Sequence, residues 1–199
     1  MEVLHLNVGQ LQTNCYIVWA KGSKACAVID PGDEPNHILK NIADRDLTLE
    51  AVLLTHGHFD HVGGAAALRK ETGCKVYMNL KELALPERLT AGPLPYTDAF
   101  GGSVTAGGLT FRVLETPGHS EGSVCLISGD IIFSGDTLFA GTCGRTDLPT
   151  GSWSEILKSF KKLAALPGDY TVYPGHGPAT TMNDERAYNP YMTAYGTEA

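Results

Sequence analysis

The sequence has no apolar run that approaches the roughly 20 residues needed to cross a membrane. Its first residues lack the basic start and the small-residue cleavage site of a secretory signal, so we expect no exported precursor. Basic residues are also few, since 15 Lys and Arg stand against 22 Asp and Glu, a net charge of −7. This balance argues against nucleic-acid binding, which needs a basic face. Small anionic substrates remain compatible with it, because a local metal charge can outweigh a global acidic balance.

Cysteine is scarce, and its five residues are scattered without a C-x-x-C pair. An odd, dispersed set in a chain without a signal segment predicts reduced thiols and a cytoplasmic location. Low-complexity tracts, clear repeats and long linkers are missing as well. Because 199 residues suffice for one full hydrophobic core, we interpret residues 1–199 as a single domain. Nothing in the sequence indicates how many subunits the protein has.

What the sequence does contain is an alternation of short strands and helical patterns. In the first half we expect helices at 35–45 and 62–73 and strands at 3–8, 15–20, 25–30, 51–55 and 74–78. In the second half we expect a capped helix at 152–166 and strands at 109–116, 123–128, 130–136 and 170–176. Two strand-rich halves, each with helices, suggest two sheets packed face to face with the helices outside.

Titratable groups are concentrated in THGHFDHVGG, which directly follows the apolar strand predicted at 51–55. His56 and His58 lie two positions apart, so both project to the same side of an extended segment. Asp60 and His61 fall at the start of the next helix. Imidazole and carboxylate groups on such a rigid base suit a divalent metal such as zinc, manganese or iron. The alternative, surface histidines in a polar turn, suits a lone histidine better than this cluster.

Glycines accompany this cluster. We expect Gly57, between the two histidines, to serve a tight turn of the backbone. We expect Gly63 and Gly64 to let the following helix pack closely against the sheet.

Three later segments share one form, a strand followed by glycine and a ligand-type residue. They contain His119 in TPGHS, Asp136 in FSGD and His176 in YPGHG. Each of these residues alone could belong to an ordinary turn or loop. Together with the first cluster they supply five histidines and two aspartates at strand ends, the number and kind of ligands for two metals that share one carboxylate. His5 and His37 lack this context, and we interpret them as structural or surface residues.

The segments THGHFDH, PGH, SGD and PGH, in this order along the chain, resemble the motifs of the metallo-β-lactamase superfamily. The resemblance implies an α/β fold, a four-layer αβ/βα sandwich of two mixed β-sheets flanked by helices, with the site at one edge. It also implies a ligand set: His56, His58 and His119 for one metal, Asp60, His61 and His176 for a second, and Asp136 as the bridge.

The stretch LFAGTCGRTDLPTGS is similar to the loop after the bridging aspartate in glyoxalase II-type thioesterases and in persulfide dioxygenases. The closing segment YPGHGPATTMNDERAYNPYM resembles compact bacterial glyoxalase II-like proteins. Since the sequence ends soon after His176, we expect the C-terminal helical domain with which typical glyoxalase II enzymes contact glutathione to be missing.

The resemblance implies a metallohydrolase that cleaves an S-acylglutathione, such as S-lactoylglutathione, by means of a hydroxide bridging two divalent metals. Zinc is the expected metal, with iron and manganese as alternatives. We expect Asp60 to orient the hydroxide, and a thiolate leaving group needs little proton assistance. Arg145 is the candidate to bind an anionic part of the substrate; the alternative is an ion pair with Asp147 that fixes the loop.

Two other functions remain open. Persulfide dioxygenases of this superfamily use one iron on the equivalents of His56, His119 and Asp136 and share the tetrapeptide GRTD. A mononuclear-iron oxygenase acting on glutathione persulfide is therefore the alternative, and oxygen consumption separates the two reactions. A non-catalytic metal-binding module is disfavoured, because this ligand set leaves the metals open to water and substrate. An aspartate instead of a cysteine at position 136 argues against the antibiotic-hydrolysing branch.

Overall fold

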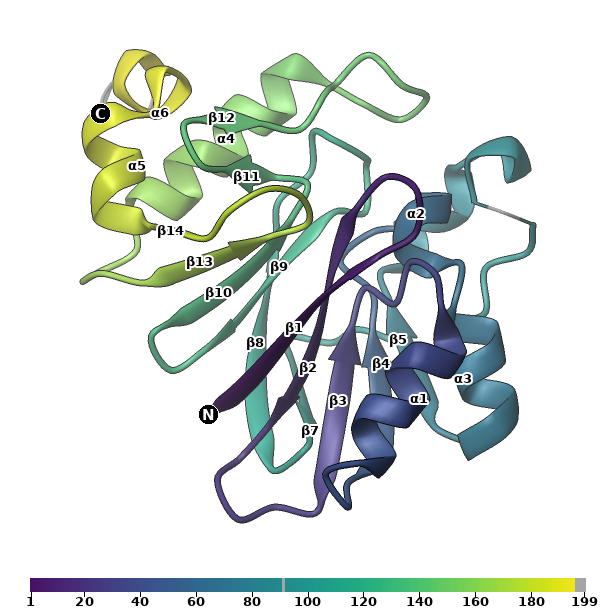
Figure 1. The fold of residues 1–199 in the computed structure, drawn as a ribbon. Coiled ribbons are helices and arrows are strands. Elements are labelled where there is room, and N and C mark those ends of the chain that lie inside the picture. The colour runs from purple at the N-terminus through teal and green to yellow at the C-terminus, as the bar shows by residue number, and fades with distance from the viewer. Residues whose placement is uncertain (91, 196–199) are drawn as a thin grey trace.

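The computed structural model of the chain describes residues 1–90 and 92–195 (Figure 1). Two six-stranded sheets face each other, and helices cover the outer side of each sheet. The predicted fold class, two mixed sheets flanked by helices, is confirmed. Within the described residues, no helix combines the length and the apolar character that a membrane crossing requires.

The first sheet is formed by the N-terminal half of the chain. Its strands, in spatial order, are β1 (Glu2–Val8), β2 (Thr13–Trp19), β3 (Ala25–Ile29), β4 (Thr48–Leu53), β5 (Lys75–Met78) and β6 (Asp98–Ala99). Strands β1 to β3 are antiparallel, and β3 to β6 are parallel. Parallel neighbours need crossover connections, which α1 (Pro35–Ala43) and α3 (Ala65–Thr72) provide. Both helices pack on the outer face of this sheet, where α1 buries Ile38 and Ile42.

The second sheet is formed by the C-terminal half. Its strands, in spatial order, are β14 (Thr180–Thr181), β13 (Thr171–Pro174), β10 (Ile131–Gly135), β9 (Val124–Ser128), β8 (Leu109–Glu115) and β7 (Ser103–Ala106). Only the pair β10–β13 is parallel, and α4 (Trp153–Ala164) lies in the connection between them. Helices α5 (Met182–Tyr188) and α6 (Pro190–Tyr195) lie beside α4 on the outer face.

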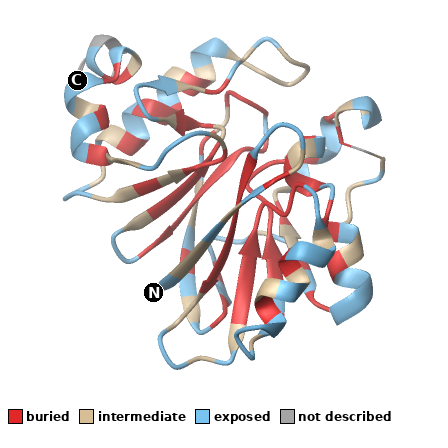
Figure 2. Ribbon diagram, in the orientation of Figure 1, coloured by how far each residue is buried: buried red, intermediate tan, exposed pale blue. Residues whose placement is uncertain are grey.

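The buried side chains form three apolar clusters that correspond to the layers. The central cluster lies between the two sheets and includes Tyr16, Leu53, Phe111 and Phe133. The other two lie between each sheet and its helices, as the buried colouring of the strands and inner helix faces shows (Figure 2). This rigid sandwich fixes where the strand ends, and the residues after them, come together.

Short elements complete the chain. They are α2 (Phe59–Val62), the 3₁₀ helices η1 (Leu80–Ala84) and η2 (Glu87–Leu89), and the two-stranded ribbon β11 (Leu138–Phe139) and β12 (Thr142–Cys143). The sequence pattern does not predict most of these elements, because they are too short to show a clear period. The same holds for β6, β7, β14, α5 and α6.

The helix predicted at 62–73 is interrupted, because α2 ends before Gly63 and α3 begins after Gly64. Gly64 N donates a hydrogen bond of 2.7 Å to Pro31 O. A Cβ on Gly63 would lie 2.4 Å from Gly32 O. The two glycines therefore permit close packing, as expected, but against the loop after β3 and not against the sheet.

Phe111 offers a test of the central cluster. Its side chain is fully buried between the sheets, so the variant Phe111→Ala should lower the free energy of unfolding by about 3–5 kcal/mol. Urea unfolding followed by circular dichroism measures this. The matched control is Tyr188→Ala, since Tyr188 is 80% exposed and its truncation should change stability by less than about 0.5 kcal/mol. Similar losses in both variants would contradict the assignment of the core.

Candidate metal centre

Seven predicted ligand residues come together at one edge of the sandwich, where strand ends of both sheets meet. His56 and His58 follow β4, Asp60 and His61 lie in α2, His119 follows β8, Asp136 follows β10, and His176 follows β13. Six of them, all except Asp136, form two clusters of three, and within each cluster the possible ligand atoms lie within 4.8 Å of one another. Residues up to 120 positions apart in the sequence, from His56 to His176, therefore share one small volume.

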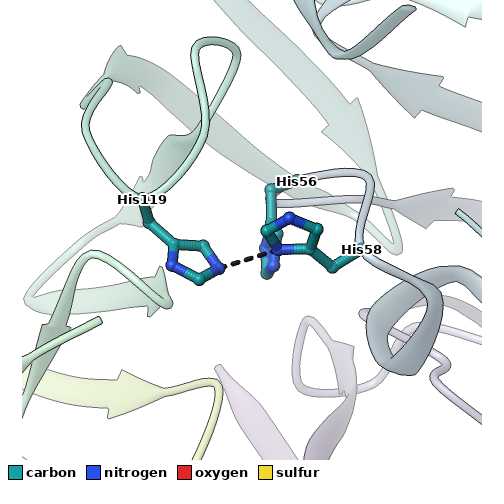
Figure 3. Close-up of side chains that lie close together, drawn as sticks. All are labelled: His56, His58 and His119. Carbon is teal, nitrogen blue, oxygen red and sulfur yellow. Dashed lines mark hydrogen bonds between the residues drawn. The ribbon is translucent and has the colours of Figure 1, made fainter. Parts of the chain in front are cut away.

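The first cluster consists of three buried histidines, His56, His58 and His119. Their imidazole rings lie close together, with His58 Nδ1 2.8 Å from His119 Nε2 (Figure 3). His56 and His58 belong to a loop of the first sheet, whereas His119 belongs to a loop of the second. This three-histidine group thus depends on how the two sheets are held together.

The second cluster contains Asp60, His61 and His176. His176 Nε2 lies 3.1 Å from Asp60 Oδ2 and 3.3 Å from His61 Nε2. Asp136 lies between the two clusters, because its Oδ1 is 3.3 Å from His61 Nε2 and its Oδ2 is 3.6 Å from His119 Nε2. A carboxylate in this place contacts both groups, as expected for one shared by two cations.

Hydrogen bonds orient three of the rings. The Nδ1 atom of each faces away from the centre: His56 Nδ1 lies 3.1 Å from Thr55 Oγ1, His61 Nδ1 2.9 Å from Asp30 Oδ2, and His119 Nδ1 2.8 Å from Arg145 O. With a proton on Nδ1, each ring keeps the lone pair of Nε2 for the centre. This is the arrangement of metal-ligating histidines with outer hydrogen-bond partners.

Unpaired polar atoms test whether the residues fit a metal. Among the described residues, the buried side-chain atoms without a hydrogen-bond partner are His56 Nε2, His58 Nε2 and Asp136 Oδ1, although His61 Nε2 lies 3.3 Å from the last. Leaving such atoms unpaired in the interior is costly, and native proteins rarely do so. All three atoms belong to predicted ligand residues: two are in the three-histidine cluster, and the third is on Asp136, between the two clusters. Imidazole and carboxylate donors in this number fit divalent zinc, iron or manganese.

Burial keeps the three-histidine group uncharged. It is the main cause that lowers the pKa of His56 and of His119, and it lowers the pKa of His58 to about 4. Repulsion from neighbouring imidazoles acts in the same direction. At neutral pH these rings therefore offer free lone pairs, which a cation requires.

The second cluster has the opposite electrostatics. Burial alone would raise the pKa of Asp136 and of Asp60, but the neighbouring imidazoles outweigh it and lower both values. Burial likewise opposes the rise in the pKa of His61, which the carboxylates of Asp136 and Asp30 produce. In this cluster, the negative charge of the carboxylates is therefore balanced by protonated imidazole. A bound cation would supply that positive charge in place of the proton.

Asp30 belongs to the candidate site, although sequence reasoning missed it. It directly follows β3, is buried, and accepts hydrogen bonds from Thr55 N at 2.7 Å and Thr55 Oγ1 at 2.5 Å, besides its contact with His61. Through Thr55 it also reaches His56. The signal was present, because Asp30 follows an apolar strand and precedes Pro-Gly, much as the predicted ligands stand at strand ends.

Glu82 was missed too, and it corrects the interpretation of Gly57. The backbone of Gly57 is not in the left-handed region, so its conformation alone does not require glycine. A Cβ there would instead lie 2.9 Å from Glu82 Oε2 and 3.0 Å from Leu85 Cδ1. Nothing in the sequence marks Glu82, because it lies in a short 3₁₀ helix far from the histidine motifs.

The cluster opens into a hollow of about 230 Å³. Its wall is largely apolar, formed by Leu11, Phe59, Leu89 and Leu148. Arg145 is a lining residue as well, but its guanidinium also makes two contacts of 2.7 Å with Asp147. The ion pair considered as the alternative for Arg145 is therefore present.

Comparisons with known proteins agree with this geometry. The family model described as metallo-beta-lactamase superfamily matches residues 8–176. The chain is 35% identical over 211 residues to hydroxyacylglutathione hydrolase GloC from Haemophilus influenzae, in an alignment covering 98% of this chain and 99% of that protein.

Solved structures give a similar result. The crystal structure of BLEG-1 B3 metallo-beta-lactamase has a TM-score of 0.86 and 34% identity, covering 96% of this chain and 100% of that chain. TTHA1623 in a di-iron-bound form has a TM-score of 0.83 and 38% identity, covering 95% and 100%.

Gly175 gives a test of how closely the cluster is packed. A Cβ at this position would lie 2.2 Å from Asp136 Oδ1 and 2.7 Å from His61 Cε1. Gly175→Ala should therefore displace the shared carboxylate, and the purified variant should lose at least one metal equivalent, measured by elemental analysis. Gly102→Ala is the control, because no atom lies within 4 Å of the added methyl group. Unchanged metal content in Gly175→Ala would contradict the assignment of Asp136 as a shared ligand.

Proposed function

The chain belongs to the metallo-beta-lactamase superfamily, and from this premise we propose that it is a metal-dependent thioesterase of the glyoxalase II type. The observation that carries the proposal is the pair of clusters joined by Asp136 and open to a hollow of about 230 Å³. Similarity to GloC over nearly the whole of both chains supports an S-acylglutathione, such as S-lactoylglutathione, as the substrate.

The proposed ligand sets follow the two clusters. His56, His58 and His119 hold one divalent cation, and Asp60, His61 and His176 hold the second, with Asp136 shared. Zinc is the proposed metal, and iron is the alternative that the di-iron-bound relative supports. When bound, the cations supply a hydroxide nucleophile at neutral pH and positive charge for the carbonyl oxygen.

Asp60 is the proposed catalytic residue of the chain itself. Its carboxylate lines the hollow, and the neighbouring imidazoles lower its pKa, so it remains an acceptor at neutral pH. Thr13 Oγ1 donates a hydrogen bond of 3.3 Å to Asp60 Oδ2 and restrains its orientation. Asp60 is thus placed to accept a hydrogen bond from the attacking water and to orient it toward the thioester.

Arg145 and the apolar wall are proposed to position the substrate. The Arg145–Asp147 pair is exposed, with 61% and 67% of the two side chains accessible. An ion pair so exposed contributes little to stability, so a substrate carboxylate can replace Asp147. The leucine and phenylalanine side chains of the wall would exclude water around the acyl group.

Two other reactions have specific support. The tetrapeptide GRTD and the similarity to ETHE1 from Myxococcus xanthus, with a TM-score of 0.85 and 30% identity, favour a mononuclear-iron persulfide dioxygenase as the alternative. The similarity to BLEG-1 favours β-lactam hydrolysis, despite the aspartate at position 136. Both differ from the thioesterase in a measurable product or co-substrate.

The primary test is loss of thioester absorbance from S-lactoylglutathione by zinc-loaded protein under nitrogen. We expect turnover without oxygen, its loss after dialysis against a chelator, and its return with zinc, because the metals supply the nucleophile. Glutathione persulfide with an oxygen electrode and a chromogenic cephalosporin are assayed in parallel. Oxygen uptake or β-lactam cleavage without any thioester turnover would replace the proposed reaction by the corresponding alternative.

The role of Arg145 is tested with two variants of one ion pair. If Arg145 binds the substrate, Arg145→Ala should raise KM for S-lactoylglutathione about tenfold, equivalent to about 1.4 kcal/mol, with kcat changed less than about twofold. Asp147→Asn leaves the guanidinium free and should not raise KM. If the pair only fixes the loop, both variants will impair the enzyme to the same degree.

A further inference from the structure

Glu82 is a fully buried carboxylate to which the proposed reaction assigns no role. Three uncharged groups donate hydrogen bonds to it: Gly57 N to Oε2 at 2.5 Å, and Ser120 Oγ and Gly122 N to Oε1, both at 2.7 Å. Burial raises the pKa of Glu82 despite these donors. Taking a carboxylate out of water is costly, so the contacts that it makes deserve a specific explanation.

The three donors belong to two loops that come from different sheets. Gly57 lies between His56 and His58, in the loop after β4 of the first sheet. Ser120 and Gly122 follow His119, in the loop after β8 of the second sheet. One carboxylate therefore joins the two loops that together supply the three-histidine group.

Both loops are shaped to admit this side chain. A Cβ on Gly57 would lie 2.9 Å from Glu82 Oε2, and a Cβ on Gly122 would lie 2.6 Å from Glu82 Oε1. Ser120 is held in turn, since its Oγ lies 2.6 Å from Ser123 Oγ and its backbone N donates to the same oxygen at 3.1 Å. The fit on both sides fixes the distance between the loops and leaves little room for another side chain.

We propose that Glu82 is a positioning residue that sets the separation of His58 and His119 and thereby the metal affinity of the three-histidine group. The inference rests on the proposed metal-binding function. A metal site tolerates only about 0.2 Å of error in its ligand distances. His58 and His119 are carried by different sheets, so a contact that joins their loops directly controls this distance. Outer partners of this kind typically change metal affinity about 10–100-fold.

The experiment compares two buried glutamates. Glu82→Gln keeps the volume but places an NH₂ group against N–H or O–H donors, which disrupts the link. Glu185→Gln is the matched control: Glu185 is 3% exposed and accepts hydrogen bonds from Gly141 N, Thr180 Oγ1 and Asn189 Nδ2, none adjacent to a proposed ligand. Both variants should lose thermal stability, because both leave buried donors poorly paired.

Metal affinity distinguishes a residue that positions the histidines from a residue that only stabilises the fold. Chelator competition with zinc should give wild-type affinity for both equivalents in Glu185→Gln, and about 10–100-fold weaker binding of one equivalent in Glu82→Gln. The visible spectrum of the Co²⁺-loaded protein should change in Glu82→Gln alone, because it reports ligand geometry. If Glu82→Gln does not fold, Ser120→Ala removes one donor and keeps the carboxylate, and should weaken the same equivalent about threefold or more.

Two results would overturn the inference: wild-type affinity and spectrum in the Glu82 variant, or equal weakening of metal binding in the Glu185 control. For Ser120→Ala, unchanged affinity for both equivalents has the same meaning. Failure of the proposed function is recognised separately in the wild-type protein, which would then bind no metal or would bind metal without hydrolysing a thioester. The two proposals therefore fail through different measurements.

Discussion

Desolvation of the histidine and aspartate cluster is the constraint on which the rest of the structure depends. Imidazoles with no access to water cannot hold protons easily, while carboxylates in the same volume need positive charge beside them. The chain meets both demands by separating the groups, with neutral rings around His58 and His119 and ionised partners around Asp60 and His61. Such a balance requires ligands fixed to within tenths of an ångström, and only a rigid scaffold provides that precision.

The sandwich supplies this scaffold through its strand ends. Parallel strands deliver the residues after β4, β10 and β13, and antiparallel pairing delivers His119 after β8. Hydrogen bonds from the Nδ1 atoms of the rings to Asp30, Thr55 and the Arg145 carbonyl then set the ring orientations. The site therefore depends on the fold at two levels. Apolar packing between the sheets brings the loops together, and hydrogen bonds within the loops orient single nitrogen atoms.

Sequence pattern predicted the strands and helices that have clear turn signals at their ends. It also predicted that the histidines and aspartates gather at one place, because several of them follow a strand in the same local form. His56 and His58 after an apolar strand, or His176 after Pro-Gly, are visible without tertiary structure. Asp30 had the same kind of signal and was overlooked. Glu82 had none, because its significance lies in contacts with residues 25, 38 and 40 positions away. The break between α2 and α3 also depends on a distant loop, at Pro31 and Gly32.

The glycines that surround the cluster divide the site into two parts with different freedom to change. At Gly57, Gly122 and Gly175 the neighbouring atoms leave no room for even one methyl group, so the floor of the site resists substitution. The wall residues Leu11, Phe59, Leu89 and Leu148 only face a hollow, where side chains of other sizes fit without moving a ligand. Substitutions in the wall of the hollow can therefore change which substrates fit, while the residues that carry out hydrolysis stay the same.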